Sequence, residues 1–257
     1  ELRCKYNAAF KNLHIAASGN YNLFTTTNAT YDPTLHVEDC TVDAAYNVVY
    51  DSHNTQNFQK IYFGNSIVKM TVANKPFYST KAKDAHTQQL IRLDNNVFYA
   101  ETPLQNYLIN CGDRSQAFQT TRLQVEVTNN TIYNIYQPNI MIRAYVLAGL
   151  TVTKNVGYYT GVTAKNYLTG VYDTAGFTAD KAEVTYNYLY TAPVSDTNFW
   201  SAKHTGSYTP ANNQMGDGVE APFSSMDAAK GYFPVDASVV KTGAGATYDT
   251  KAWFKTE

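Results

Sequence analysis

The stretch IRLDNNVFY, residues 91–99, decides the fold that the sequence predicts. Ile91 and Leu93 alternate with polar neighbours, as in a half-buried strand, and Phe98 resumes the alternation after a polar interruption at residues 94–96. No glycine follows the asparagines, so the interruption does not fit the Asn-Gly turn of a β-hairpin. The stretch therefore predicts two short strands that meet at a corner of another kind.

Seven segments of the chain fit this one template. They begin at residues 2, 35, 61, 91, 125, 150 and 182, and each has apolar residues at its first and third positions. The sixth position is asparagine in five of the seven segments, namely Asn7, Asn96, Asn130, Asn155 and Asn187. Such self-similarity is typical of repeat proteins, in which each unit stacks on its neighbours.

The spacing of the repeats favours a solenoid. Successive segments begin 25 to 34 residues apart, and a solenoid accepts this variation because its loops lie outside the stack of strands. Asparagine suits a corner between strands, since it accepts left-handed backbone angles and its amide can hydrogen-bond to the coils above and below. We therefore expect a parallel β-helix in which the five asparagines form a structural ladder.

Composition agrees with one mainly β domain. The 257 residues include 22 Tyr and no run of 18 consecutive apolar residues, so strands are favoured and a membrane-spanning helix is not expected. A net charge of −1 with only five arginines gives no basic stripe, and nucleic acid is not an expected partner. Cys4, Cys40 and Cys111 lack zinc-site spacing and are expected to be buried thiols.

Over residues 2 to about 190, these repeats resemble the right-handed parallel β-helix proteins of the pectin-lyase-like superfamily, in which the second and third sheets meet at an Asn-bearing corner. The chain from Ala221 is similar to the closing segment of many secreted bacterial β-helices. It has Pro-Phe at 222–223, Ala-Ala-x-Gly-x-Phe at 228–233 and Gly-Ala-Gly-Ala at 243–246. Overall the chain resembles uncharacterised gut-bacterial β-helix domains associated with polysaccharide utilisation.

The resemblance implies an all-β, right-handed, single-stranded parallel β-helix of about seven coils. We assign the coils to residues 1–192, and the end coil with a C-terminal capping segment to residues 193–257 of the same domain. Open ends of a solenoid expose strand edges that would pair with other chains. Residues 12–21 and the tail after Ala192, with Trp253 and Phe254, are the candidates for covering those edges.

The resemblance also indicates where to seek a site. Saccharide-binding clefts in the resembled superfamily generally lie along the first sheet and its loops. The first sheet must precede each template match, and apolar runs occur there at residues 22–26, 47–50, 76–80, 107–110, 140–144 and 167–171. Stacked on one another, these runs would form one face of the helix.

Charged residues within or after those runs are the candidate site residues. The candidate catalytic residues are Arg143, Arg114 and Asp113. The candidate binding residues are Asp51, His53, Lys81, Lys83, Asp84, His86 and Asp173. Arginine and lysine would hold an anionic sugar, and the fork of arginine suits a carboxylate. Ordinary solvated loop residues would give the same pattern.

Three classes of function stay open. The first is a secreted or cell-surface protein that binds plant or host polysaccharide without proven catalysis. The second is a lyase, in which a base removes the proton alpha to a uronate carboxyl while cations or calcium stabilise the product-like state, or a hydrolase with two or three carboxylates. The third is a structural or adhesive solenoid.

Polysaccharide binding is the favoured expectation. The chain lacks dense Asp clusters, and fold analogy alone does not supply an activity. Exposed tyrosines would stack on sugar rings, although most of them are expected to fill strands. The expected partner is a polysaccharide, and calcium is the one cofactor that we consider. The expected state is a monomer, alone or within a larger surface protein, and an extracellular or bacterial outer-surface location follows from the resemblance alone.

Overall fold

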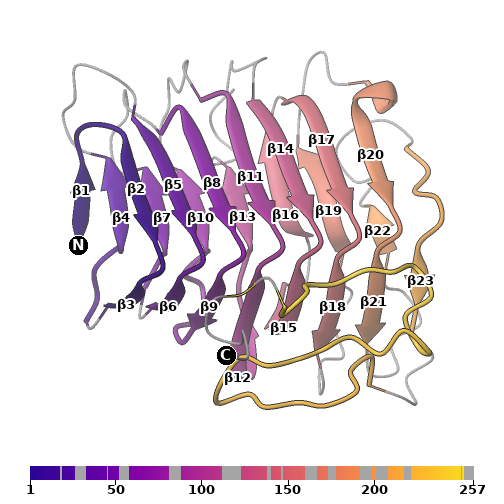
Figure 1. The fold of residues 1–257 in the computed structure, drawn as a ribbon. Coiled ribbons are helices and arrows are strands. Elements are labelled where there is room, and N and C mark those ends of the chain that lie inside the picture. The colour runs from indigo at the N-terminus through magenta and orange to yellow at the C-terminus, as the bar shows by residue number, and fades with distance from the viewer. Residues whose placement is uncertain are drawn as a thin grey trace.

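The computed structural model describes the chain outside residues 18, 27–32, 45, 52–57, 81–87, 112–122, 138–139, 146, 160–166, 173–177, 192–197, 201–207, 217–220, 250 and 252–257. In these described residues the strands form three sheets, and every strand pairs with its neighbours in parallel. One short 3-10 helix, Ala179–Lys181, precedes the last strand of the second sheet. The chain winds from sheet to sheet and stacks coil on coil (Figure 1).

Each coil contributes one strand to each sheet, except that the last coil has no described strand in the second. The first sheet contains β1 (Leu2–Cys4), β4 (Phe24–Thr26), β7 (Val49–Asp51), β10 (Tyr78–Thr80), β13 (Ile109–Cys111), β16 (Ile140–Tyr145), β19 (Tyr167–Tyr172) and β22 (Asn198–Trp200). The second contains β2 (Ala8–Lys11), β5 (Thr34–Glu38), β8 (Lys60–Gly64), β11 (Leu90–Asp94), β14 (Leu123–Thr128), β17 (Leu147–Thr153) and β20 (Ala182–Thr185). The third contains β3 (His14–Ala17), β6 (Thr41–Ala44), β9 (Ile67–Met70), β12 (Val97–Gln105), β15 (Thr131–Tyr136), β18 (Val156–Tyr159), β21 (Tyr188–Thr191) and β23 (Gln214–Met215).

The predicted fold class is confirmed: the protein is an all-β parallel β-helix. All six apolar runs that we expected in the first sheet coincide with its strands β4, β7, β10, β13, β16 and β19. Cys4, Cys40 and Cys111 are buried free thiols, as predicted.

The core of the helix consists of like residues stacked from coil to coil. Leu35, Ile61, Ile91 and Val125 are fully buried and pair in register along the second sheet. Aromatic rings fill the wider interior, where Phe77 lies with its ring centroid 4.9 Å from that of Phe63 and from that of Phe98. Burial of each such side chain contributes about 1.5–3 kcal/mol. A single coil has no neighbour to supply this burial, so the stack is the unit of stability.

The corner between the second and third sheets divides two tasks between adjacent residues. The first corner residue has a left-handed backbone in every coil, and these residues are Asn12, Asp39, Asn65, Asn95, Asn129, Lys154, Tyr186 and Asn212. The next residue forms the ladder between coils. We expected one asparagine to do both, whereas the ladder asparagine follows the left-handed residue. Lysine and tyrosine occur at the left-handed position because the ladder bonds hold the corner.

The ladder runs through Asn96, Asn130, Asn155 and Asn187, all fully buried. Asn130 Oδ1 accepts hydrogen bonds from the Asn96 backbone N–H at 2.9 Å and the Asn96 side-chain amide at 3.1 Å, and Asn130 Nδ2 donates to the Leu93 carbonyl at 2.9 Å. The same arrangement repeats in the following coils. Cys40 and Ser66 extend the column at one end, and Asn213 extends it at the other.

The prediction for Asn7 is wrong. Ala8 pairs with Leu35 across the second sheet, so the true register of the first coil begins six residues after the predicted one. Asn7 lies between β1 and β2, is exposed, and its Oδ1 accepts the Thr34 backbone N–H at 2.8 Å. The alternation of Leu2 and Cys4 belongs to the first sheet and imitates the template. For the same reason, residues 12–21 contain β3 of the first coil instead of a separate cover.

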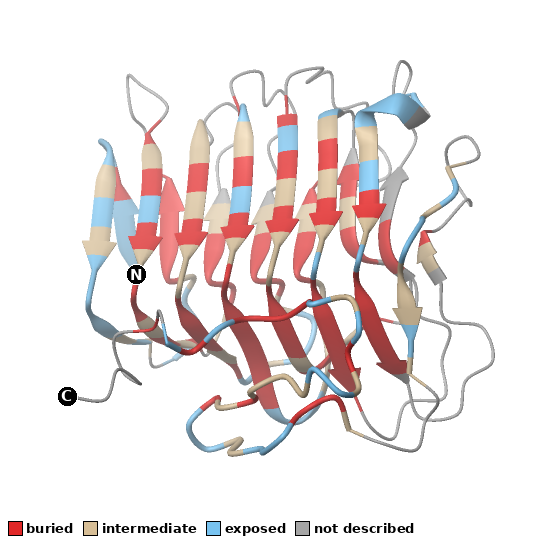
Figure 2. Ribbon diagram, turned by 45° about the vertical axis from the view of Figure 1, so that its right-hand side comes forward, coloured by how far each residue is buried: buried red, intermediate tan, exposed pale blue. Residues whose placement is uncertain are grey.

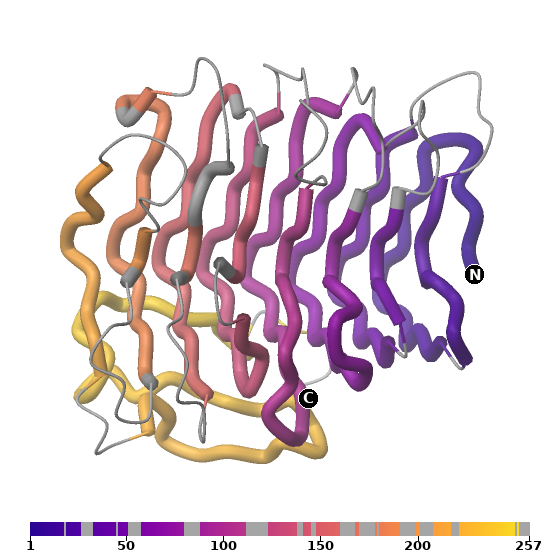
Figure 3. The backbone as a smooth tube through the Cα atoms, turned by 180° about the vertical axis from the view of Figure 1, so that it is seen from behind, coloured from indigo at the N-terminus to yellow at the C-terminus, as the bar shows by residue number. Residues whose placement is uncertain are grey.

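The segment 221–251 is here called the C-terminal strap, and its described residues pack on the outer face of the third sheet (Figures 1 and 3). Phe223, Phe233 and Tyr248 form a second apolar core there with outward-facing residues of β9, β12, β15, β18 and β21. The fit is close: Gly245 has a φ of +104°, and a Cβ on it would lie 2.4 Å from Val235. Of the expected end coil and cap, β22 and β23 stack on β19 and β21, whereas the strap packs on a sheet face. Trp253 and Phe254 lie outside the described residues.

Candidate functional site

A pocket of about 320 Å³ lies on the outer face of the first sheet. Its lining residues come from β7, β10 and β13 and from the chain that enters β4 and these strands. They are Asn22, Tyr46, Asn47, Tyr50, Asn74, Lys75, Pro76, Ser79, Tyr107 and Asn110. Three tyrosines, four asparagines and one lysine thus dominate the wall. The pocket occupies the sheet on which we expected a saccharide site.

Strand alternation places the floor of the pocket. Tyr78 and Ile109 point into the core and are fully buried, so the next residues, Ser79 and Asn110, face outward. In the register of the first sheet, Tyr50 pairs with Ser79, Ser79 with Asn110, and Asn110 with Arg143. These residues form a polar column that runs across the coils.

Asn47 supplies an unsatisfied acceptor to the wall. Its Nδ2 donates to Asn22 Oδ1 at 2.7 Å, which joins two successive coils. The side chain is 6% exposed, and within the described part of the chain its Oδ1 accepts no hydrogen bond. A buried acceptor without a donor destabilises a protein by about 1–3 kcal/mol.

Lys75 brings a positive charge to the pocket without a compensating acid. Its Nζ donates to the Tyr46 hydroxyl at 2.6 Å and lies 4.0 Å from the centroid of the Tyr46 ring. No ion pair of the described residues includes Lys75. Both contacts hold the ammonium in place and leave its charge for an incoming anion.

Arg143 lies beside this pocket, on β16. Its Nε donates to Asn110 Oδ1 at 2.9 Å, its Nη2 donates to the same oxygen, and its guanidinium carbon lies 4.9 Å from the centroid of the Tyr107 ring. Asn110 and Tyr107 both line the pocket, so Arg143 extends the same polar surface by one coil. Its strand position faces outward, in line with one of the two arrangements that the run NIMIRAYVLAGL allows.

The other predicted site residues lie outside the described structure. These are Arg114, Asp113, His53, Lys81, Lys83, Asp84, His86 and Asp173. Asp51 ends β7, where its backbone pairs with Thr80, and its side chain is not described. Arg143 is therefore the one predicted catalytic or binding residue whose side chain is described, and it lies beside the pocket.

The sequence pattern does not single out the residues that build the pocket. The predicted residues lie within or after the strands of the first sheet, whereas Tyr46, Lys75 and Tyr107 precede them by two or three residues. The one regularity is that polar or aromatic residues recur within four residues before β7, β10 and β13, at 46–47, 74–75 and 106–107.

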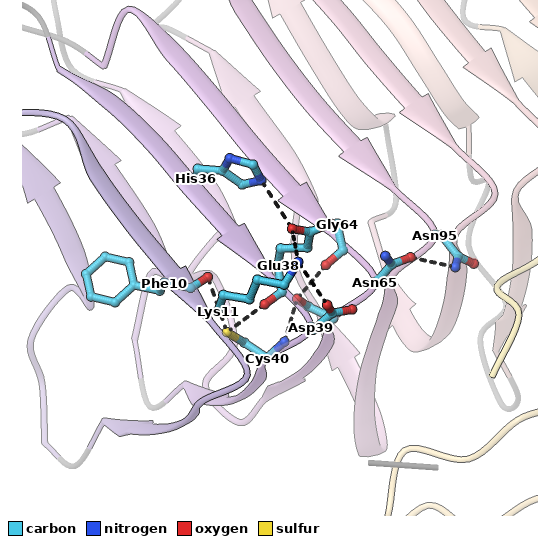
Figure 4. Close-up of polar contacts among 10 residues, drawn as sticks. Phe10, Lys11, His36, Glu38, Asp39, Cys40, Gly64, Asn65 and Asn95 are labelled. Carbon is cyan, nitrogen blue, oxygen red and sulfur yellow. Dashed lines mark hydrogen bonds and ion pairs between the residues drawn. The ribbon is translucent and has the colours of Figure 1, made fainter. Parts of the chain in front are cut away.

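A second group of charged residues lies at the first corners of the helix (Figure 4). Lys11 Nζ lies 2.9 Å from Glu38 Oε2 and 3.6 Å from Asp39 Oδ2, and His36 Nε2 lies 3.9 Å from Glu38 Oε2. The hydrogen bond to Glu38 raises the pKa of Lys11. These charges neutralise one another on an exposed surface, so the group is a set of surface ion pairs.

Cys40, below that group, is not a nucleophile. Burial raises the pKa of its thiol, and its Sγ donates to the Glu38 carbonyl at 3.2 Å and the Phe10 carbonyl at 3.6 Å (Figure 4). The reactive form of cysteine is the thiolate, which this environment disfavours. The described residues also contain no cluster of three His, Cys, Asp or Glu side chains that would hold a metal ion.

Comparison of the chain with protein-family models, curated proteins and solved structures finds no match. Among the described residues, no helix has the length and hydrophobicity of a membrane span. What the site can do must therefore follow from its own chemistry. Its described lining holds tyrosine rings, asparagine amides, a serine hydroxyl and an ammonium, which are groups that recognise a polar ligand by stacking and hydrogen bonding.

Proposed function

We propose that this protein binds polysaccharide along its first parallel sheet, with the pocket over β7, β10 and β13 as the centre of the site. The observation that carries the proposal is the lining of this pocket, in which three tyrosine rings lie among four asparagine amides. Sugar rings present apolar CH faces, which pack on aromatic rings, and hydroxyls, which exchange hydrogen bonds with amides that both donate and accept.

The layout favours a chain over a single sugar. The polar column from Tyr50 to Arg143 crosses four strands, which at about 4.8 Å between strands is roughly 14 Å. Lys75 within the pocket and Arg143 at its edge favour a glycan that carries acidic groups, because each offers a cation at a fixed place.

We further infer that the protein is related to the pectin-lyase-like β-helices and to gut-bacterial β-helix domains that serve polysaccharide utilisation. The corner asparagines and the closing segment 221–246 support this relationship. It places the protein outside the cell or on the outer surface of a bacterium, as a monomer or as part of a larger surface protein. Both inferences rest on the resemblance.

Binding is tested with a glycan array and a panel of pectin, alginate and chondroitin, followed by titration calorimetry on the hits. Tyr50→Ala is expected to weaken binding at least tenfold, because it removes a ring from the pocket floor. Tyr62→Ala is the matched control, since Tyr62 belongs to β8 of the second sheet and contacts His36 instead of the pocket. Equal losses in the two variants would refute a site on the first sheet.

The same panel separates the two other classes of function. Absorbance at the unsaturated-uronate band, followed with and without calcium, would reveal a lyase, and release of reducing ends would reveal a hydrolase. Loss of either signal in Tyr50→Ala would show that the proposed binding site is an active site. Absence of binding to every glycan would favour the structural or adhesive solenoid.

A further inference from the structure

We propose that Lys251 is a proton-sensitive latch that fastens the end of the C-terminal strap to the β-helix. Lys251 is 1% exposed, although lysine is almost never fully buried without a partner of opposite charge. Its Nζ donates to the backbone carbonyls of Asn95 and Thr247, each at 2.7 Å, and lies 5.4 Å from the centroid of the Tyr248 ring. All three contacts are to uncharged groups.

The latch joins two parts of the molecule that are far apart in sequence. Asn95 is the left-handed corner residue between β11 and β12, and its Oδ1 accepts the Thr247 backbone N–H at 2.8 Å and the Thr247 hydroxyl at 3.2 Å. Tyr248 then ties the strap together, because its hydroxyl donates to the Gly231 carbonyl at 2.8 Å and accepts the Phe233 N–H at 2.7 Å. The end of the strap is thus fixed at one corner, with the Lys251 amine at its centre.

Burial and the surrounding carboxylates shift the pKa of the Lys251 amine in opposite directions, and burial has the larger effect. Burial lowers the pKa of Lys251 to about 7, against the attraction of Asp249 on the strap, Asp39 at the corner after β5 and Asp94 at the end of β11. Tyr248 faces the amine with a titratable ring, and burial raises the pKa of its hydroxyl. No ion pair of the described residues includes Lys251, so these carboxylates act from a distance.

The direction of the pH effect follows from the two states. With the strap attached the pKa is about 7, and with the strap detached the amine returns to its ordinary value of 10.5. The detached state therefore binds the proton more tightly, and attachment weakens as pH falls from about 10.5 to about 7. Below that range the effect is constant. The equilibrium changes by at most about tenfold per pH unit.

Two measurements on the full chain test the latch. The first is NMR titration of the Lys251 ε-carbon, which is expected to report a midpoint near 7. The second is hydrogen exchange of the Thr247 and Lys251 amides between about pH 6.5 and 9.5, corrected for intrinsic exchange, in which protection is expected to rise with pH.

Lys251→Met keeps the length of the side chain and removes the titrating group, so its protection is expected to lose the pH slope. Lys230→Met is the matched control on the same strap, because that lysine is exposed and pairs with Asp227, and its slope is expected to persist. A Lys251 midpoint near 10.5, or equal slopes in all three proteins, would overturn the proposal. Should Lys251→Met fail to fold, the titration of the unaltered protein alone decides.

Discussion

The outer faces of the first and third sheets differ although the same coils build both. The third sheet presents Tyr99, Tyr158 and Tyr190, which are buried with Phe223 and Phe233 of the strap, and the partly buried Tyr133 packs against them. The first sheet presents Ser79, Asn110 and Arg143, and a pocket opens there. Figure 2 shows the result, because third-sheet strands under the strap, such as β18, are red, whereas strands of the second sheet alternate.

The comparison teaches which residues of a β-helix are free to carry function. Stacking dictates the inward residues, which must match from coil to coil. Outward residues have no such constraint, and their chemistry decides whether a face is covered or left open. Aromatic rings alone do not mark a binding face here, since Tyr133 stacks on Phe233 at 4.0 Å under the strap while Tyr107 lines the pocket.

The largest expected effect is on the covered face, which is the outer face of the third sheet under the strap. Phe233 is fully buried and stacks on Tyr133, so Phe233→Ala is expected to destabilise the protein by about 3–5 kcal/mol. Urea unfolding followed by circular dichroism measures the change, and binding of a hydrophobic dye reports exposure of the third sheet. Glycan binding at the first sheet is expected to persist under native conditions. Loss of binding at unchanged stability would show that the two faces are not independent.

The next largest effect is expected at the asparagine ladder, in the corner between the second and third sheets. Asn130→Ala removes the acceptor for the Asn96 N–H and the donor for the Leu93 carbonyl, both buried, and is expected to cost about 3 kcal/mol. Asn7→Ala is the control at the position that the repeat pattern wrongly placed in the ladder. Its expected change is below about 1 kcal/mol, because its acceptor is exposed to water. Similar losses in the two variants would contradict the ladder.

Much of the fold was predictable because the coils repeat one physical pattern. Alternation around an asparagine corner recurs in IRLDNNVFY and VEVTNNTIY, and inward residues such as Ile91 and Val125 must match to stack. The first coil escaped prediction because Leu2, Cys4 and Asn7 reproduce the pattern six residues too early. Asn213 escaped because its coil has only a two-residue strand, β23, after the corner.

The candidate site was predictable only to the level of the sheet. The first sheet follows from the repeat, and Arg143 is conspicuous within an apolar run. The repeat does not predict the pocket, because Lys75 bonds to Tyr46 from 29 residues away and Asn47 bonds to Asn22 from 25 residues away. Such contacts depend on how the chain enters each strand, and no local pattern encodes that geometry. A capping segment was expected in this region, but the face that the strap covers was unpredictable for a similar reason, since its Thr247 meets Asn95 from 152 residues away.

A smaller effect is expected on the open face, which is the outer face of the first sheet with its pocket. Arg143→Ala is expected to weaken binding of acidic polysaccharide by ten- to a hundredfold, about 1.4–2.8 kcal/mol, while the melting temperature changes little. Arg92→Ala is the control, because Arg92 pairs with Glu126 on the second sheet, away from the pocket. A fall in melting temperature in Arg143→Ala that exceeds the fall in Arg92→Ala would assign Arg143 a structural role.

The smallest expected effect isolates the charge inside the pocket. Lys75→Met keeps the stem against the Tyr46 ring and removes the ammonium, so affinity for an acidic polysaccharide is expected to fall about tenfold, about 1.4 kcal/mol. Binding of a neutral polysaccharide is expected to stay the same, and raising the salt concentration should reduce the difference between the two proteins. Calorimetry with pectin before and after methyl esterification makes the comparison on one backbone. A loss that is equal for both forms would mean that Lys75 shapes the pocket and does not bind an anion. The open face would then recognise sugar rings through tyrosine and asparagine alone, and its contrast with the covered face would lie in exposure instead of charge.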